Sequence, residues 1–70
     1  EDYMANVPVY MSYADLRKVD FIGADLRDAD LSFANLTDCL FLTQSQINSA
    51  KGNSKTLLPS DLEKPKHWLN

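Results

Sequence analysis

Large apolar residues recur at every fifth position between residues 16 and 41. They are Leu16, Phe21, Leu26, Leu31, Leu36 and Phe41. In an α-helix, five residues advance about 500°, so these side chains would spiral around the helix and form no buried face. In a straight strand, residues five apart point to opposite faces. The pattern therefore predicts a chain that turns a corner after every few residues and winds into a coil with flat sides.

A small residue stands two positions before each large one. The small residues are Ala14, Val19, Ala24, Ala29, Ala34 and Cys39. Because residues two apart in an extended segment share a face, both members of each pair are expected to point into a narrow interior. The polar residues between them, Asp15, Asp20, Asp25, Asp30 and Asn35, are expected to face water as a solvated surface.

The unit A-(D/N)-L-X-X recurs as YADLR, GADLR, DADLS and FANLT. On these units, the chain resembles the pentapeptide repeat family over about half of its length. The resemblance implies an all-β solenoid, a right-handed quadrilateral parallel β-helix of about two coils, capped by a short C-terminal α-helix and an irregular tail. The expected parts are an N-terminal extension (1–8), the β-helix (9–43), a capping helix (44–52) and the tail (53–70).

If the coil has four sides of five residues, residues twenty apart should lie above one another. The expected pairs are Phe21 with Phe41 inside, and Tyr13 with Phe33, Ile22 with Leu42 and Lys18 with Asp38 outside. Neighbouring coils about 4.8 Å apart would allow the aromatic rings to stack and the opposite charges to form an ion pair.

The segment after the repeats has the signals of a short helix. Thr43 and Gln46 have the spacing of a capping box, in which each side chain bonds the other's free backbone N–H. A helix over about residues 44–51 would lie across the open end of the coil, with Gly52 in the left-handed position after it.

The tail, with prolines at positions 59 and 65, is expected to follow an irregular path. It resembles the C-terminal tail that often follows the repeats in bacterial members. Its apolar residues are expected to cover the outward side chains of Ile22, Leu40 and Leu42. They are Leu57, Leu58, Leu62 and Trp68.

Composition limits the chemistry that the chain could perform. The 70 residues carry a net charge of −3 and one cysteine, at an inward position. The acidic balance and the lack of a basic stripe argue against nucleic-acid binding, and no apolar run has the length of a membrane span. His67 has no second histidine or nearby cysteine for a metal site, and the spacing of Ser60, Asp61 and His67 does not favour a hydrolytic triad. No catalytic, cofactor-binding or metal-binding residue is predicted, and no cofactor is expected.

The sequence therefore favours a non-catalytic scaffold or protein–protein interaction module, or a small subunit of a larger assembly. The candidate partner-contact surface is Tyr13, Phe33, Ile22, Leu40 and Leu42. A protein partner or end-to-end self-association is expected, without direct membrane insertion. The resemblance also implies an alternative, a DNA-mimic-like binder of type II topoisomerase (gyrase). The resemblance further implies a location in the bacterial cytoplasm, or in the thylakoid lumen if Glu1 is a processed N-terminus.

Overall fold

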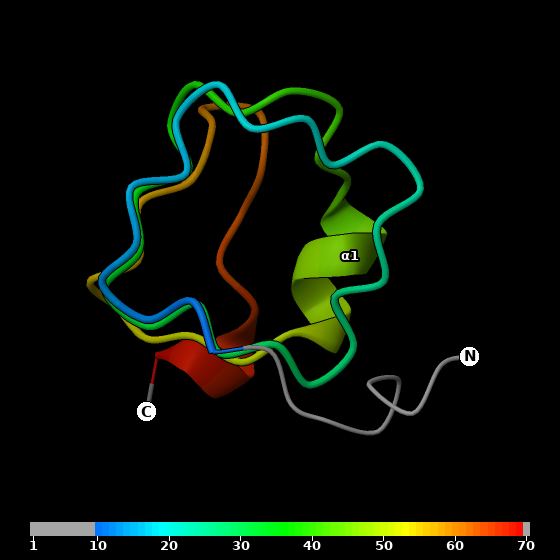
Figure 1. Ribbon diagram of the computed structural model, residues 1–70. Helices are drawn as coiled ribbons and strands as arrows, with labels where there is room; N and C mark the ends of the chain where they lie inside the picture. Colours follow the sequence, from blue (N-terminus) through cyan, green and yellow to red (C-terminus); the bar gives the residue numbers. More distant parts are fainter. Residues whose placement is uncertain (1–9, 70) are drawn as a thin grey trace.

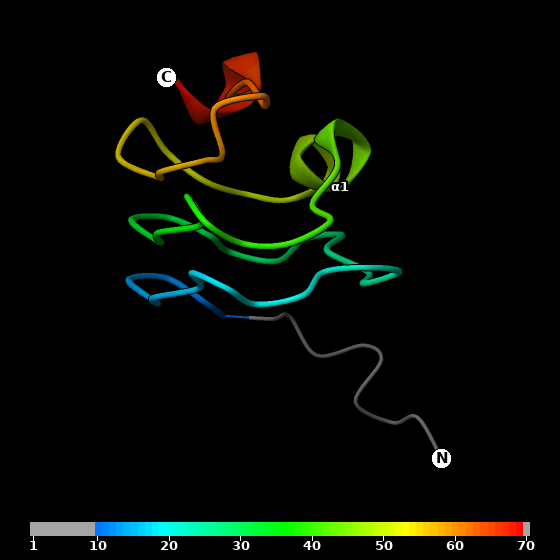
Figure 2. The same cartoon turned by 90° about the horizontal axis from the view of Figure 1, so that it is seen from above.

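A computed structural model gives the structure of the chain and describes residues 10–69. The chain winds in stacked coils about one axis, seen along that axis in Figure 1 and at right angles to it in Figure 2. Parallel β-bridges join the first coil to the second at Tyr10 and Asp30, at Asp15 and Asn35, and at Asp20 and Leu40. The stacking of residues twenty apart, predicted from the sequence, is confirmed at these three positions.

Each corner of the coil is a β-turn that starts at a large inward residue. The N–H of the small inward residue donates to the carbonyl three positions earlier, as from Ala24 to Phe21 or from Ala34 to Leu31, both at 3.0 Å. The third turn residue has positive φ in five successive turns, as in a type II turn. These residues are Tyr13, Lys18, Gly23, Asp28 and Phe33. The five-residue period is therefore a turn repeated once on each side.

Four of these five positions hold a residue other than glycine. The left-handed conformation costs such a residue about 1 kcal/mol or more. The coil must offset this cost through its stacked backbone hydrogen bonds and its core. The fully buried part of the core includes Ala29, Leu31, Ala34, Leu36 and Ile47.

The expectation of an all-β solenoid needs correction in one respect. Between residues 10 and 69 the β pairing consists of isolated bridges, and the regular elements are α1 (Gln44–Ser49) and the 3₁₀ helix η2 (Lys66–Trp68). Two residues of every five lie in a turn, so a side is too short to pair at consecutive residues. The β-helix is therefore a stack of turns joined by single bridges.

Helix α1 begins with the predicted capping box. The Thr43 hydroxyl accepts from the Gln46 N–H at 3.1 Å, and the Gln46 side-chain oxygen accepts from the Thr43 N–H at 2.9 Å. The Gln46 side chain also donates to the carbonyls of Phe21 and Ala24, each at 2.9 Å. Ile47 is fully buried in the core. Helix α1 therefore forms one side of the second coil, above residues 21–28, rather than lying across the open end as expected.

The register changes just before α1. The Phe41 side chain is 64% exposed and its backbone has φ 61°, whereas Leu42 packs against the core. The left-handed conformation turns Phe41 outward and brings Leu42 inward one residue later. The predicted inward pairing of Phe21 with Phe41 and the outward pairing of Ile22 with Leu42 are therefore wrong.

The tail builds part of a third coil and then closes it. Lys51 bridges Asp30, and Leu57 bridges Asn35, so the offsets grow from twenty to 21 and 22 residues. Thr56 is fully buried and its hydroxyl donates to the Leu31 carbonyl at 2.9 Å. The segment after it crosses the end of the coil in Figure 1 and leads to η2.

Trp68, the last residue of η2, is 1% exposed. Its indole N–H donates to the Ala50 carbonyl at 3.0 Å, and its ring lies against Gly52, where an added Cβ would stand 2.6 Å from the indole. Gly52 does not have positive φ, so the left-handed position predicted for it is wrong. Its role is to leave room for Trp68. The tail thus covers the end of the core, and Ile22 and Leu40 remain exposed, contrary to expectation.

Candidate functional site

The predicted contact surface divides into two places on the coil wall. Tyr13 and Phe33 stack with their ring centroids 4.6 Å apart and their planes at 5°, so this predicted aromatic pair is confirmed. Ile22 and Leu40 are 70% and 48% exposed on another part of the wall. Leu42 does not join them, because it packs against the core.

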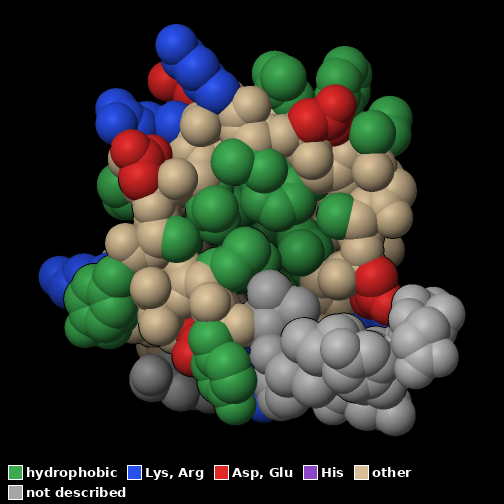
Figure 3. Space-filling model, viewed as in Figure 1, with side chains coloured by type: hydrophobic (Ala, Val, Ile, Leu, Met, Phe, Trp, Pro, Cys, Tyr) green, Lys and Arg blue, Asp and Glu red, His purple; other side chains and the backbone are tan. Residues whose placement is uncertain are grey.

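Phe41 takes the place of Leu42 on the surface, although the five-residue period predicts that Phe41 points inward. The five-residue period could not reveal that Phe41 points outward, since this depends on the sign of the φ angle of one residue. In Figure 3, apolar side chains gather around an acidic group on the upper right of the face.

The acidic residues of the repeats have a structural role that the expected solvated surface did not include. The side-chain oxygen of each Asp or Asn accepts the backbone N–H two residues later, where the turn begins. The pairs are Asp15 with Arg17, Asp20 with Ile22, Asp25 with Arg27, Asp30 with Ser32 and Asn35 with Thr37, at 2.9–3.2 Å. Such Asx turns fix the chain direction at each corner, and so hold the wall side chains in place.

Two of these acids also form ion pairs within the turn. Arg17 binds both carboxylate oxygens of Asp15, at 2.8 and 2.7 Å, and Arg27 binds Asp25 in the same way, at 2.9 and 2.7 Å. These hydrogen bonds lower the pKa of Asp15 and of Asp25 to about 2. The pKa of Asp30 is also lowered, chiefly by the hydrogen bonds from Ser32.

The predicted ion pair between Lys18 and Asp38 does not form. The Lys18 backbone N–H donates to the Asp38 carbonyl at 3.0 Å, but among residues 10–69 the ion pairs are those of Asp15 and Asp25. A shallow hollow of about 330 Å³ lies here, lined by charges of both signs from Asp15, Arg17, Lys18 and Asp38. Its mixed charge gives it no clear preference for an anion or a cation.

The residues with catalytic potential are not brought together. His67 Nε2 lies 3.0 Å from the Ala50 carbonyl oxygen, so the imidazole takes part in the closure of the coil. Within the described range, no three His, Cys, Asp or Glu side chains are grouped as metal ligands. Cys39 is half-buried beside the core, and burial raises the pKa of its thiol. Neither of the two helices between residues 10 and 69 could cross a bilayer.

Comparison with known proteins agrees with the repeat geometry. The family model for pentapeptide repeats matches eight copies over residues 9–41. Residues 9–41 of the chain are therefore pentapeptide repeats. Pentapeptide repeat proteins are generally non-catalytic interaction modules or scaffolds. The match ends before α1, so the resemblance of the tail to that of bacterial members stays a prediction.

One curated protein contains a segment similar to part of this chain. Uncharacterized protein YybG of Bacillus subtilis (strain 168) is 62% identical over 29 residues, which are 41% of this chain and 10% of that protein. The chain thus covers a tenth of that relative's length. No solved structure matches the chain significantly.

The ion pairs of the repeats predict a stability that falls in acid. Asp15 and Asp25 have pKa values of about 2 in the fold against 3.8 without it, so unfolding at acidic pH takes up protons. Their contribution is present above about pH 4 and is lost as the pH falls toward about 2. We expect the urea midpoint, followed by circular dichroism, to drop across this interval.

The double variant Asp15→Asn, Asp25→Asn is the matched control. Asparagine keeps an oxygen for the turn N–H and removes the titrating group. The midpoint of this variant should therefore fall less steeply over the same interval. An equally steep fall would show that these two carboxylates do not carry the acid sensitivity.

Proposed function

We propose that this pentapeptide repeat protein is a non-catalytic scaffold that binds another protein through its coil wall. The observation that carries the proposal is the set of large apolar side chains held outward on that wall. They are Tyr13, Ile22, Phe33, Leu40 and Phe41. Single exposed apolar residues are ordinary on protein surfaces, but grouped ones mark contact sites.

Rigidity of the wall supports a binding role. The backbone at Tyr13 donates to Ser32 at 2.9 Å in the next coil, and that at Phe21 donates to Leu40 at 2.9 Å. Side chains mounted on such a frame lose little conformational freedom when a partner binds, so more of the contact energy appears as affinity. The family's right-handed quadrilateral winding would present these residues on flat faces.

The alternative, mimicry of DNA toward a type II topoisomerase, has less support. That role requires a dense acidic surface that can compete for a positively charged groove. Here Arg17 and Arg27 neutralise Asp15 and Asp25 on the repeat wall. We expect no inhibition in a gyrase supercoiling assay at micromolar protein, and inhibition that weakens with salt would reverse this ranking.

A comparison of surface variants tests the scaffold proposal. The wild-type chain and the variant Tyr13→Ser, Ile22→Ser, Phe41→Ser would be immobilised, and retained proteins would be compared by mass spectrometry. Tyr10→Ser, which changes another exposed aromatic residue, is the control. We expect a protein that the wild type and the control retain and that the wall variant loses. Sedimentation of the free chain would reveal end-to-end self-association.

Equal retention by all three chains, or no retention by any of them with a strictly monomeric free chain, would contradict binding through the wall. Circular dichroism must first establish that the wall variant folds. Because the three substituted side chains are exposed, their replacement should leave the core intact.

A further inference from the structure

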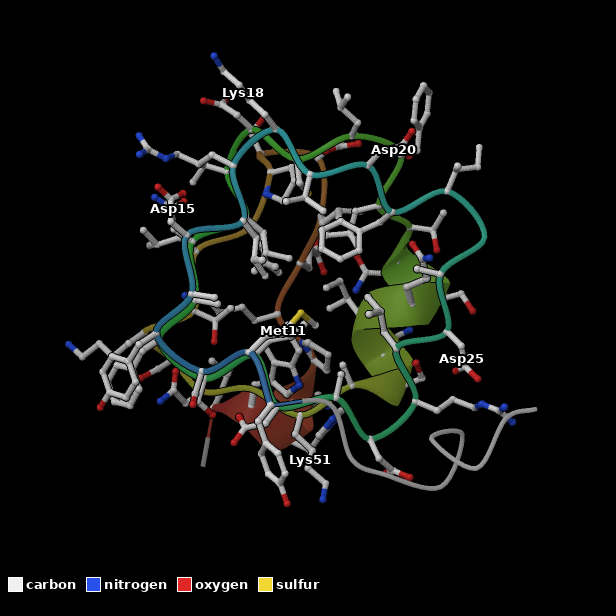
Figure 4. All side chains as sticks on the ribbon, in the orientation of Figure 1. Met11, Asp15, Lys18, Asp20, Asp25 and Lys51 are labelled. Carbon is white, nitrogen blue, oxygen red and sulfur yellow. The ribbon has the colours of Figure 1, made fainter. Side chains whose placement is uncertain are left out.

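One apolar patch on the wall surrounds a carboxylate. Ile22, Leu40 and Phe41 are 70%, 48% and 64% exposed, and together with Asp20 they define the Asp20 patch. Asp20 bridges Leu40 in the next coil, and its Oδ1 accepts the Ile22 N–H at 2.9 Å. Figure 4 labels Asp20 on the outer edge of the coil. Ile22 thus stands two residues after Asp20, Leu40 is its bridge partner, and Phe41 follows Leu40 in the chain.

Asp20 differs from the other aspartates at its position in the repeat. Asp15 and Asp25 each bind the arginine two residues later, and Asp30 bridges Lys51, whose charge helps to lower its pKa. Two residues after Asp20, where the neighbouring repeats have arginine, the chain has Ile22. The bridge partner of Asp20 is Leu40, which is also uncharged. Among residues 10–69, Asp20 forms no ion pair, and its Oδ2 accepts no hydrogen bond.

An apolar partner alone would fit this patch poorly. It would cover a carboxylate without supplying a cation, and burying an unpaired charge is costly. A lysine or arginine on the partner would instead donate to the remaining oxygen in a charge-assisted hydrogen bond. The surrounding apolar contacts would exclude water and strengthen this attraction. The chain's net charge of −3 also favours the approach of a basic partner.

We propose that the Asp20 patch binds a segment of a partner protein that is apolar and carries a lysine or arginine opposite Asp20. This inference rests on the proposed scaffold function and names the chemistry of its partner. The repeats contain the same kind of ion pair, because Asp15 and Asp25 in the neighbouring turns each bind an arginine two residues later.

Synthetic peptides can test the patch without knowledge of the partner. We would measure, by fluorescence anisotropy, the binding of a labelled set of short apolar peptides that differ at one central residue, Lys, Arg, Gln or Glu. Peptides with Lys or Arg should bind the wild-type chain about tenfold more tightly than those with Gln, which corresponds to one charge-assisted hydrogen bond. Peptides with Glu should bind least.

Two variants isolate the carboxylate. Asp20→Asn keeps the oxygen for the Ile22 N–H and removes the charge, so the preference for Lys and Arg over Gln should disappear. Ile22→Arg recreates the Asp-X-Arg spacing of the neighbouring turns, and its guanidinium should occupy Asp20 and abolish the same preference. Asp15→Asn is the matched control and should keep it. Urea midpoints would verify that all three variants fold.

A preference for basic peptides that survives Asp20→Asn and Ile22→Arg would overturn the inference. So would equal binding of the Lys and Gln peptides to the wild type. If instead the free chain sediments as a dimer that Ile22→Arg dissociates, the occupant is a second copy and the stated partner is wrong. In each of these cases the scaffold proposal is judged separately, by whether the wall variant loses its retained protein.

Discussion

Trp68→Ala is expected to lower the free energy of unfolding by about 3–5 kcal/mol. The indole is 1% exposed, fills the space above Gly52 and donates to the Ala50 carbonyl. Its removal leaves a cavity at the closed end of the coil. For a domain of 70 residues this loss approaches the whole stability. Urea unfolding would be followed by far-ultraviolet circular dichroism, because the variant lacks the chain's single tryptophan.

Two further variants control this result. Leu69→Ala truncates the exposed neighbour of Trp68 and should change stability by no more than about 0.5 kcal/mol. Gly52→Ala places a methyl group 2.6 Å from the indole and should displace the ring, so it should destabilise the fold while Trp68 is still present. Equal midpoints for Trp68→Ala and Leu69→Ala would mean that the tail does not close the core.

Leu36→Asp and Phe41→Asp are expected to have very different effects on folding, although both residues belong to the same five-residue period. Leu36 is fully buried, so an aspartate there would place an unpaired charge in the core and prevent folding. Phe41 is exposed with φ 61°, a conformation that aspartate adopts more readily than phenylalanine. Phe41→Asp should therefore stay within about 0.5 kcal/mol of the wild type.

Circular dichroism and urea midpoints of both variants would check this contrast. If Phe41→Asp also failed to fold, the outward placement of Phe41 would be wrong and the simple repeat would extend to this position. Leu36→Met, which conserves volume, separates the effect of charge from that of shape and should retain the fold.

The repeat region could be predicted because each side of the coil repeats the same pattern of a large and a small inward residue joined by a turn. Leu31 and Ala34 are inward for the same reason as Leu16 and Ala24, so one observation applies to every side. The stacking of Tyr13 on Phe33 followed from the spacing of twenty alone. The change at Phe41 has no such redundancy. It depends on one backbone angle, and the sequence pattern does not encode the sign of that angle.

The closure of the coil could not be predicted for a different reason. Trp68 reaches the core from a segment with no period, and the space that it enters exists because position 52 lacks a side chain. Gly52, which stands before a proline-containing tail, is typical of a helix terminus. Its sequence position does not indicate that it leaves room for the indole of Trp68. Capping of α1, by contrast, depends only on Thr43 and Gln46, three residues apart, and it was predicted correctly.

The exposure of the residues in the candidate surface was predicted in part. Exposure of Tyr13, Ile22, Phe33 and Leu40 followed from the inward and outward alternation. The distinct character of Asp20 could be read from Ile22 at the arginine position, but only once the turn geometry shows that an arginine two residues after an aspartate reaches its carboxylate. The spacing alone does not reveal that contact.

The three bridges between the first and second coils, each at an offset of twenty, also define how a chain of this kind can change in length during evolution. Duplication of twenty residues would add one layer and preserve every vertical column of side chains. Duplication of five would keep the inward frame but rotate each residue to the neighbouring side, so surface groups such as the Tyr13–Phe33 pair would separate. A single inserted residue would shift the frame beyond it, and between residues 10 and 69 such shifts occur only where the repeats give way to the closing segment.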